Sequence, residues 1–467
     1  MVTYFPKLIS RKAITCYFVT LAAVSVLFLD RALPFVWMLF GTVEVCSFFY
    51  FSNQLTKQWY RLGQETFVRK LFWTSLTIRM VYMVFAYFFY DFMTGQPFMF
   101  FAADEKFYYG TSKIWSEQGF DAFRNELHWI DFSDSGEIWW TGMLCMLFGP
   151  YILTARIGHC FASALTCVLI YRMTNRHFGE RTARMASIFC MLMPNLIYYC
   201  GIHLKEADMV FATVLLVDSV DVILTEKKIN WKSLVLAVFS LLAMFSFRTA
   251  LGAVGVLAVL LALALNRGKL VSVWKRVGLA ALVAILLSLT TIGNRLMNEM
   301  DDLWENREEN QTVGMEYRSQ REGGNSFAKY ASGAVFAPMI FTIPFASMVY
   351  TEGQENQQML NGGNYVKNVI SGFVVFAIAL LLIGGDWRKH VLPLSLMIGY
   401  LVVIAFSNFA HSERFHQPAL PFELMFAAYG ISQLQQKHVK WIDYWLVFIV
   451  VANVGWAWFK LAGRGLV

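Results

Sequence analysis

The feature that most constrains this chain is a succession of apolar runs separated by short polar segments along its whole length. Runs of about 20 apolar residues have the length that an α-helix needs to cross a bilayer, where backbone polar groups must be satisfied internally. The sequence therefore predicts an all-α, polytopic integral membrane bundle of roughly 12–14 transmembrane helices. The expected spans are 13–29, 33–52, 70–93, 141–173, 182–200, 207–224, 232–247, 249–265, 273–293, 335–350, 367–384, 391–408, 419–434 and 441–460.

The composition favours lipid as the solvent of this chain. Hydrophobic residues make up 57% and charged residues 15% of the 467 residues, whereas soluble domains average about 45–50% apolar and about 25% charged. We therefore expect residues 1–467 to form a single transmembrane domain. The net charge of +7 comes from Lys and Arg in alternate short loops, which is typical of membrane orientation and not of a nucleic-acid-binding surface.

Those basic loops predict the topology. With a cytoplasmic N-terminus, residues 1–69 form a helical hairpin and a cytoplasmic linker, and nearly every basic cluster lies inside. The segments 94–140 and 294–334 become the first and second large outer loops. The segment 335–350 breaks the alternation and contains Pro338 and Pro344, so it is either a broken, re-entrant segment or a kinked helix.

The first outer loop holds the sharpest candidate for chemistry, Asp104-Glu105, with Tyr108 one turn later. Two adjacent carboxylates at a membrane surface are costly to desolvate unless they have partners or a task. A carboxylate there suits a general base acting on a hydroxyl. The alternative is that Asp104 caps a helix that runs on past Tyr108.

Two further outer segments carry charge. One contains Lys205, Glu206 and Asp208, where Lys205 could neutralise an anionic substrate or simply mark the end of a span. The other contains His411 and Arg414, and arginine suits bidentate recognition of phosphate. The histidines near Arg414 lack the spacing of a metal site, so we expect no metal there.

Isolated charges complete the set of candidates. Arg248 is an outer-end cation, and Arg156, just inside an apolar helix, requires an anionic partner. Asp131, Asp134 and Glu137 precede a Trp pair, and they either contact sugar hydroxyls or form a solvated acidic loop. The sequence contains no Walker A motif, no dinucleotide fingerprint and no G-x-S-x-G, which argues against nucleotide-dependent and serine-hydrolase chemistry.

The order of these pieces resembles the GT-C superfamily of membrane glycosyltransferases, most closely the branch of protein O-mannosyltransferases and the lipid A aminoarabinose transferase. The resemblance covers about residues 70–434. The chain departs from the pattern in its extra N-terminal hairpin, 13–52, and in lacking a large soluble C-terminal domain. The matching elements are Asp104-Glu105 with Tyr108, Leu147 to Arg156, Phe178 to Ala183, Pro194, and Arg414-Phe415 with Pro418 and Pro421-Phe422.

The resemblance implies a polyprenyl-phosphate-sugar donor, a lipid, glycan or protein acceptor, and inversion at the anomeric carbon. Asp104 would activate the acceptor hydroxyl, Glu105 would support it or contact the sugar, and Lys205 and Arg414 would hold the departing phosphate. Tyr108, Glu206, Asp208, Arg248 and His411 would line the substrate site. Lysine and arginine can neutralise the charge of the phosphate, so the reaction requires no metal. Some branches of the superfamily do use a divalent cation, and this alternative remains open.

We expect a bacterial inner membrane location with the working face periplasmic or extracellular. Two other functions remain open at this point. A polysaccharide polymerase or ligase would share the lipid-linked donor but depend on arginine instead of Asp104. A transporter or flippase of lipid-linked or anionic solutes would place charges near the midplane and show repeat symmetry.

Overall fold

A computed structural model describes residues 2–119, 132–226, 230–265, 339–405 and 412–466, together with Gly278. Within these residues every regular element is a helix, and a single antiparallel bridge joins Ala32 to Val349. The predicted all-α fold is confirmed. The second large outer loop, 294–334, and the expected span 273–293 lie outside the described residues, apart from Gly278.

The helices follow the apolar runs closely in most of the described chain. Their bounds are α1 (Lys7–Leu27), η1 (Leu29–Arg31), α2 (Phe35–Gln58), η2 (Trp59–Arg61), α3 (Gln64–Thr94), α4 (Ala103–Gln118), α6 (Phe132–Phe148), α7 (Ile152–Phe178), α8 (Glu180–Leu192), α9 (Pro194–Tyr198), α10 (Glu206–Thr225), α11 (Trp231–Phe247), α12 (Thr249–Leu265), α17 (Glu355–Met359), α18 (Asn361–Ile383), η5 (Asp386–His390), α19 (Val391–Ala405), α20 (Glu413–His416), α21 (Leu420–Ser432), η6 (Gln436–His438) and α22 (Val439–Ala462).

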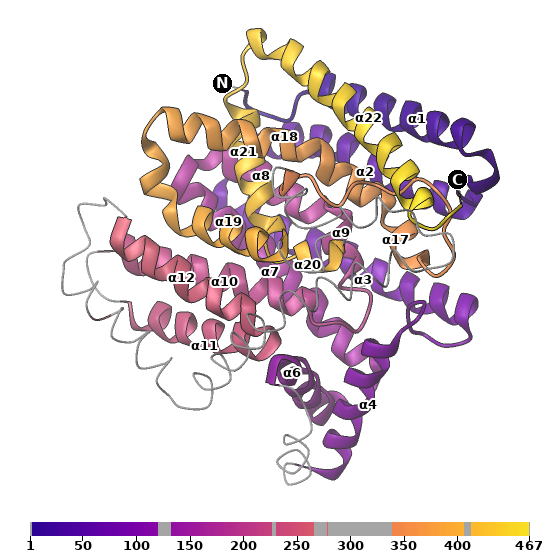
Figure 1. Ribbon diagram of the computed structural model, residues 1–467. Helices are drawn as coiled ribbons and strands as arrows, with labels where there is room; N and C mark the ends of the chain where they lie inside the picture. Colours follow the sequence, from indigo (N-terminus) through magenta and orange to yellow (C-terminus); the bar gives the residue numbers. More distant parts are fainter. Residues whose placement is uncertain are drawn as a thin grey trace, which may run out of the picture.

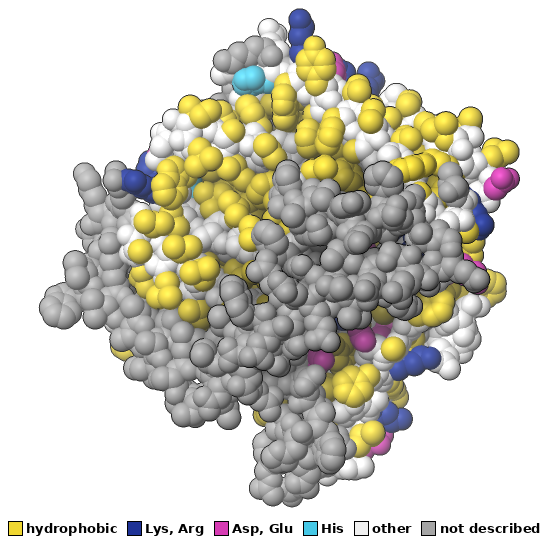
Figure 2. All heavy atoms as spheres, viewed as in Figure 1, with side chains coloured by type: hydrophobic (Ala, Val, Ile, Leu, Met, Phe, Trp, Pro, Cys, Tyr) yellow, Lys and Arg dark blue, Asp and Glu magenta, His cyan; other side chains and the backbone are white. Residues whose placement is uncertain are grey.

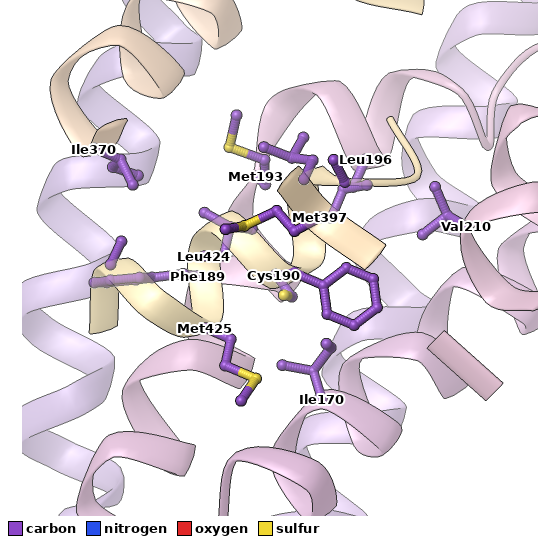
Figure 3. Close-up of a cluster of buried hydrophobic side chains, with 14 of the residues drawn as sticks. Ile170, Phe189, Cys190, Met193, Leu196, Val210, Ile370, Met397, Leu424 and Met425 are labelled. Carbon is purple, nitrogen blue, oxygen red and sulfur yellow. The ribbon is translucent and has the colours of Figure 1, made fainter. Parts of the chain in front are cut away.

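The bundle has a buried centre and an exposed periphery. α8, α10 and α21 are buried on nearly every side. They pack against α7 and α18. The centre of this packing combines Ile170, Phe189, Met397 and Met425 from four helices (Figure 3). Methionine side chains fill such irregular gaps well because they are unbranched.

The peripheral helices present apolar surface outward. In α1, α2 and α3 only 33% of the most apolar window is buried, against 61% in α7 and α18. Phe92 and Ile383 are both 86% exposed. Hydrophobic side chains cover much of the described surface in Figure 2. Seven described helical segments are long and apolar enough to cross a membrane, which supports a multi-pass membrane protein.

One end of the bundle gathers the basic segments predicted to be cytoplasmic. Arg184 donates to the carbonyl of Trp59 at 2.6 Å. Arg176 donates from Nε to Asp221 Oδ2 at 2.6 Å. His177 and His390 approach to 2.8 Å between their Nδ1 atoms. Segments far apart in the sequence therefore share one end, as the predicted alternation requires.

Two predicted spans are broken. The expectation of one helix over 141–173 is wrong, because α6 ends at Phe148 and α7 begins at Ile152. Gly149 has φ +95°, a conformation that favours glycine, and the next residue is a proline. The helix expected over 182–200 stops at Leu192, and α9 resumes with Pro194 in its first turn.

The ambiguous segment 335–350 is irregular over its described part, 339–350, which contains no α-helix. The side chain of Asn368 on α18 donates to the carbonyls of Thr342 and Pro344 at 2.5 and 3.0 Å, and it accepts from the Ala346 N–H at 3.1 Å. Those contacts satisfy buried backbone that no helix satisfies. The kinked-helix alternative is therefore wrong for 339–350.

Arg79, at the middle of α3, is fully buried. Its Nε donates to Ser163 Oγ at 2.7 Å, and its Nη1 donates to Ser75 Oγ at 2.6 Å. It also reaches the carbonyls of Cys190 and Met191 at 3.2 and 3.4 Å, near the end of α8. Carbonyls at the end of a helix have lost their intrahelical partners. Arg79 therefore caps the break before Pro194.

We predict that Arg79→Ala lowers thermal stability strongly, because it leaves buried carbonyls unpaired at a cost of about 1–3 kcal/mol each. The measurement is the melting temperature of the protein in detergent. Arg69→Ala, which removes an exposed arginine from the same helix, is the control and should melt like the unmodified protein. Equal melting of both variants would mean that Arg79 does not support the break.

Candidate functional site at the outer ends of the helices

The candidate site forms where α4, the start of α6, the segment before α10, and α20 meet. α4 and α6 pack together and protrude from the bundle at the bottom of Figure 1. Lys205, just before α10, donates to the carbonyl of Ser133 at 2.9 Å. Arg414 on α20 contacts both α4 and α10. The structure thus brings together most of the site residues expected from sequence.

Asp104 lies in the first turn of α4 and its side chain is 52% exposed. The helix is preceded by Ala102, with no side-chain cap, so the alternative of Asp104 as a capping residue is wrong. Its Oδ2 accepts a hydrogen bond from Arg414 Nη1 at 2.5 Å. An exposed carboxylate held by a cation is thus available at the outer end.

Glu105 points the other way and is fully buried. Its Oε1 accepts from Arg156 Nη2 at 2.8 Å and from the His203 N–H at 2.6 Å. Its Oε2 accepts from the Met99 N–H at 2.8 Å. Both side chains of the pair with Arg156 have 0% exposure. The expectation that Arg156 has an anionic partner is confirmed, and the partner is Glu105.

A chain of alternating charges links the outer helices. Arg414 Nε donates to Glu206 Oε1, so this arginine joins Glu206 to Asp104. Arg248 Nη2 lies 3.9 Å from the same Glu206 oxygen. Arg248 also donates to Tyr400 Oη at 3.0 Å, and its guanidinium stacks 4.2 Å from the centre of the Phe415 ring. Two arginines therefore share one buried carboxylate.

Lys205 forms a second charged group with Asp134 and Tyr108. Lys205 Nζ and the Tyr108 hydroxyl both donate to Asp134 Oδ1, the latter at 2.8 Å. Burial lowers the pKa of Lys205, and the Asp134 carboxylate opposes part of that shift. Burial, the largest single influence, raises the pKa of Asp134, but the charge and hydrogen bond of Lys205, the hydrogen bond of Tyr108 and the charge of Arg414 together lower this pKa below its usual value.

Asp208 is separate from this outer group. It is buried, and its Oδ2 lies 2.6 Å from His159 Nδ1 on α7. Donor atoms of Glu137, His159 and His203 lie within 4.8 Å of one another, an arrangement that could hold a metal ion. His411 lies outside the described residues.

Sequence reasoning underrated two residues and missed one. Asp134 and Glu137 were as consistent with a solvated acidic loop as with a site, yet Asp134 holds Lys205 and Glu137 is buried. Their spacing of three residues places both on one face of α6, a signal that was available. His159 was missed because a histidine within an apolar run reads as ordinary packing.

An apolar cavity of about 840 Å³ lies beside these charges, between α6, α7, α10 and α11. Aromatic side chains, including Trp139, Phe161, Phe211 and Phe247, line it, and Asp208 is the ionisable residue in its lining. Its volume is within the range of about 300–1,000 Å³ that is usual for ligand pockets. It can therefore accept an elongated apolar group next to a polar head.

Comparison with models of known families finds one that matches residues 137–292, the dolichyl-phosphate-mannose-protein mannosyltransferase family. The match covers about a third of the chain's length, and it confirms over these residues the resemblance to the GT-C superfamily seen in the sequence. No curated protein and no solved structure matches the chain. The family match supports a membrane glycosyltransferase of the GT-C type.

We predict that the buried ion pair of Glu105 and Arg156 is strongly coupled. Removing one partner leaves a buried charge unpaired, which costs about 3–5 kcal/mol. Glu105→Gln and Arg156→Met should each lower the melting temperature markedly, and the double variant should lose much less than their sum. Additive losses would contradict the coupling.

Asp386→Asn is the control for this cycle. It breaks the contact with Lys389, in which both side chains are more than half exposed. Exposed ion pairs contribute little to stability. Its melting temperature should therefore not change.

Proposed function

We propose that this GT-C-type glycosyltransferase transfers a sugar from a polyprenyl-phosphate donor to a hydroxyl of a lipid, glycan or protein acceptor, with inversion, on the outer face of the membrane. The observation that carries the proposal is the 2.5 Å contact between exposed Asp104 and Arg414, within a group of cations beside an apolar cavity. The proposal assigns the base to Asp104, the phosphate to these cations and the lipid to the cavity.

In this reaction Asp104 accepts the proton of the acceptor hydroxyl as its oxygen forms a bond to the anomeric carbon. The bond from that carbon to the phosphate oxygen breaks on the opposite side, which inverts the configuration. Polyprenyl phosphate leaves with the bonding electron pair. Arg414, Arg248 and Lys205 stabilise the charge that grows on this phosphate.

Arg414 is suited to this task by its position. Its side chain is 18% exposed, and two of its nitrogens contact the carboxylates of Glu206 and Asp104. A guanidinium has five N–H donors in a planar fork and matches phosphate geometry. Glu206 fixes the orientation of Arg414, so that this fork need not reorganise when the phosphate arrives.

The remaining predicted residues take positioning roles in the proposal. Glu105 anchors α4 through Arg156 and thereby places Asp104. Tyr108 holds the carboxylate that orients Lys205. Asp208 lies between the cavity wall and His159, and it does not join the outer charges. No metal takes part in the proposed reaction steps.

The cavity would accept the first isoprene units of the donor. Its lining is aromatic and aliphatic, and it opens among helices whose outer surfaces are apolar. Burial of apolar chain there would contribute about 25 cal/mol per Å² removed from water. A donor held by its lipid would then present the phosphate to Lys205 and the arginines.

We predict that Asp104→Asn lowers turnover by at least about 100-fold, because general base catalysis contributes about 10²–10⁴. The assay reconstitutes purified protein with a panel of polyprenyl-phosphate sugars and measures release of polyprenyl phosphate. Glu117→Gln, at an exposed position on the same helix, is the matched control and should retain activity. Both variants should melt like the unmodified protein.

Other results of this assay would favour the alternatives. Full activity of Asp104→Asn combined with inactivity of Arg414→Gln would indicate a polymerase or ligase mechanism that relies on arginine. Movement of lipid-linked sugar across the bilayer without bond cleavage would indicate a flippase. Either result would overturn the assignment of Asp104.

We also predict that Ala243→Phe, which narrows the cavity from α11, raises KM for a long-chain donor by about 10-fold, equivalent to about 1.4 kcal/mol. KM for a donor with a single isoprene unit should change little. Leu236→Phe is the control, because Leu236 is 42% exposed on the same helix and does not line the cavity. An equal change for both donors would place the lipid elsewhere.

A further inference from the structure

Beneath the outer charges lies a buried cluster that the proposed reaction does not use. It consists of Glu137 on α6, His159 on α7 and His203 in the segment before α10. All three side chains have 0% exposure. Three separate elements thus direct ionisable groups to one enclosed point.

Four polar atoms of these side chains lack hydrogen bonds within the described chain. His159 Nε2, His203 Nε2, His203 Nδ1 and Glu137 Oε2 are all buried without a hydrogen-bond partner. Buried polar side chains are hydrogen-bonded in the large majority of cases. His159 Nε2 and His203 Nε2 both lie near the Glu137 carboxylate, so an ion between them would supply missing partners.

The spacing fits a small transition-metal ion. Glu137 Oε1 lies 3.5 Å from His159 Nε2 and 3.8 Å from His203 Nε2. Ligands about 2.0–2.1 Å from a tetrahedral zinc ion are separated by about 3.4 Å along each edge of the tetrahedron. Only small shifts of the side chains would complete this geometry.

The surroundings of the cluster resemble those of metal ligands in general. Ligating histidines commonly hold a carboxylate with their second nitrogen, which fixes the tautomer and the ring orientation. His159 Nδ1 lies 2.6 Å from Asp208 Oδ2, so its Nε2 is directed to the cluster. Thr141 donates to Glu137 Oε1 at 3.1 Å and orients that carboxylate.

We propose that Glu137, His159 and His203 bind one divalent transition-metal ion of the zinc class, with Asp208 orienting His159. Two imidazoles and one carboxylate suit zinc better than magnesium or calcium, which prefer oxygen ligands. The fourth position would be taken by water or by Glu137 Oε2. Because no ligand is exposed, the ion holds α6 and α7 to the segment that ends in Lys205, and it does not contact substrate.

This role is independent of the proposed transfer reaction. Asp134 lies one helical turn before Glu137, and Lys205 lies two residues after His203. A metal at the cluster would thus hold both partners of the Lys205–Asp134 contact from beneath. The ion would hold this contact whatever reaction the site performs.

The first test is the metal content of protein purified with a tag that contains no histidine, measured by mass spectrometry. The expected result is about one zinc-class ion per chain, as in structural sites that bind tightly. Glu137→Gln and His203→Asn should lose it, and Asp208→Asn should weaken the affinity by about 10- to 100-fold. His390→Asn, at a buried histidine of the opposite end, should retain it.

A second measurement uses the unmodified protein alone, in case a variant fails to fold. Removing the ion with a zinc chelator should lower the melting temperature, and Zn²⁺ but not Mg²⁺ should restore it. Cobalt substitution should give the intense visible absorption of four-coordinate Co²⁺. Protein that contains no ion and takes up neither Zn²⁺ nor Co²⁺ would overturn the proposal, as would full retention of the ion by both ligand variants.

Discussion

The outer site depends on one buried ion pair, Glu105 with Arg156. Neither side chain is exposed to solvent, and the carboxylate also accepts the N–H groups of Met99 and His203. This single side chain ties the amphipathic helix α4 to α7 and to the segment before α10. Asp104, the neighbouring residue, can lie against Arg414 only because α4 is fixed in this way. These two hydrogen bonds stabilise the Glu105 carboxylate, because a charge removed from water is costly unless its lone pairs accept hydrogen bonds.

Charge is distributed by depth at this end of the molecule. Asp104 is exposed, Arg414 is partly covered, and Glu206 is buried. Below them the histidines and Glu137 are enclosed completely. Electrostatic interactions strengthen as water is excluded, so the lower groups hold the geometry while Asp104 remains accessible to solvent. The apolar cavity meets this gradient from the side, through Asp208.

Sequence reasoning predicted the fold well and the site in part. The apolar runs identified most helices because a bilayer imposes a fixed length on each. The runs did not reveal the breaks at Gly149 and Met193, since a break of a few residues leaves the average polarity of a run unchanged. The sequence predicted an anionic partner for Arg156, because an unpaired charge within an apolar helix is costly to bury. The sequence did not show which carboxylate pairs with Arg156, because the choice between Asp104 and Glu105 depends on the direction in which α4 faces. His159 and Arg79 were missed for a related reason, because only packing brings near the groups that they contact.

The hydrogen bonds of Arg79 have a consequence for motion. They connect the midpoint of α3 to α7 and to the end of α8. Sliding α3 along either neighbour would break several of these bonds at once in a region without water to replace them. We therefore expect α3, α7 and α8 to move together as one rigid body within the bundle. Any opening of the proposed site must come instead from elements outside this body, such as the short helix α20, which carries Arg414.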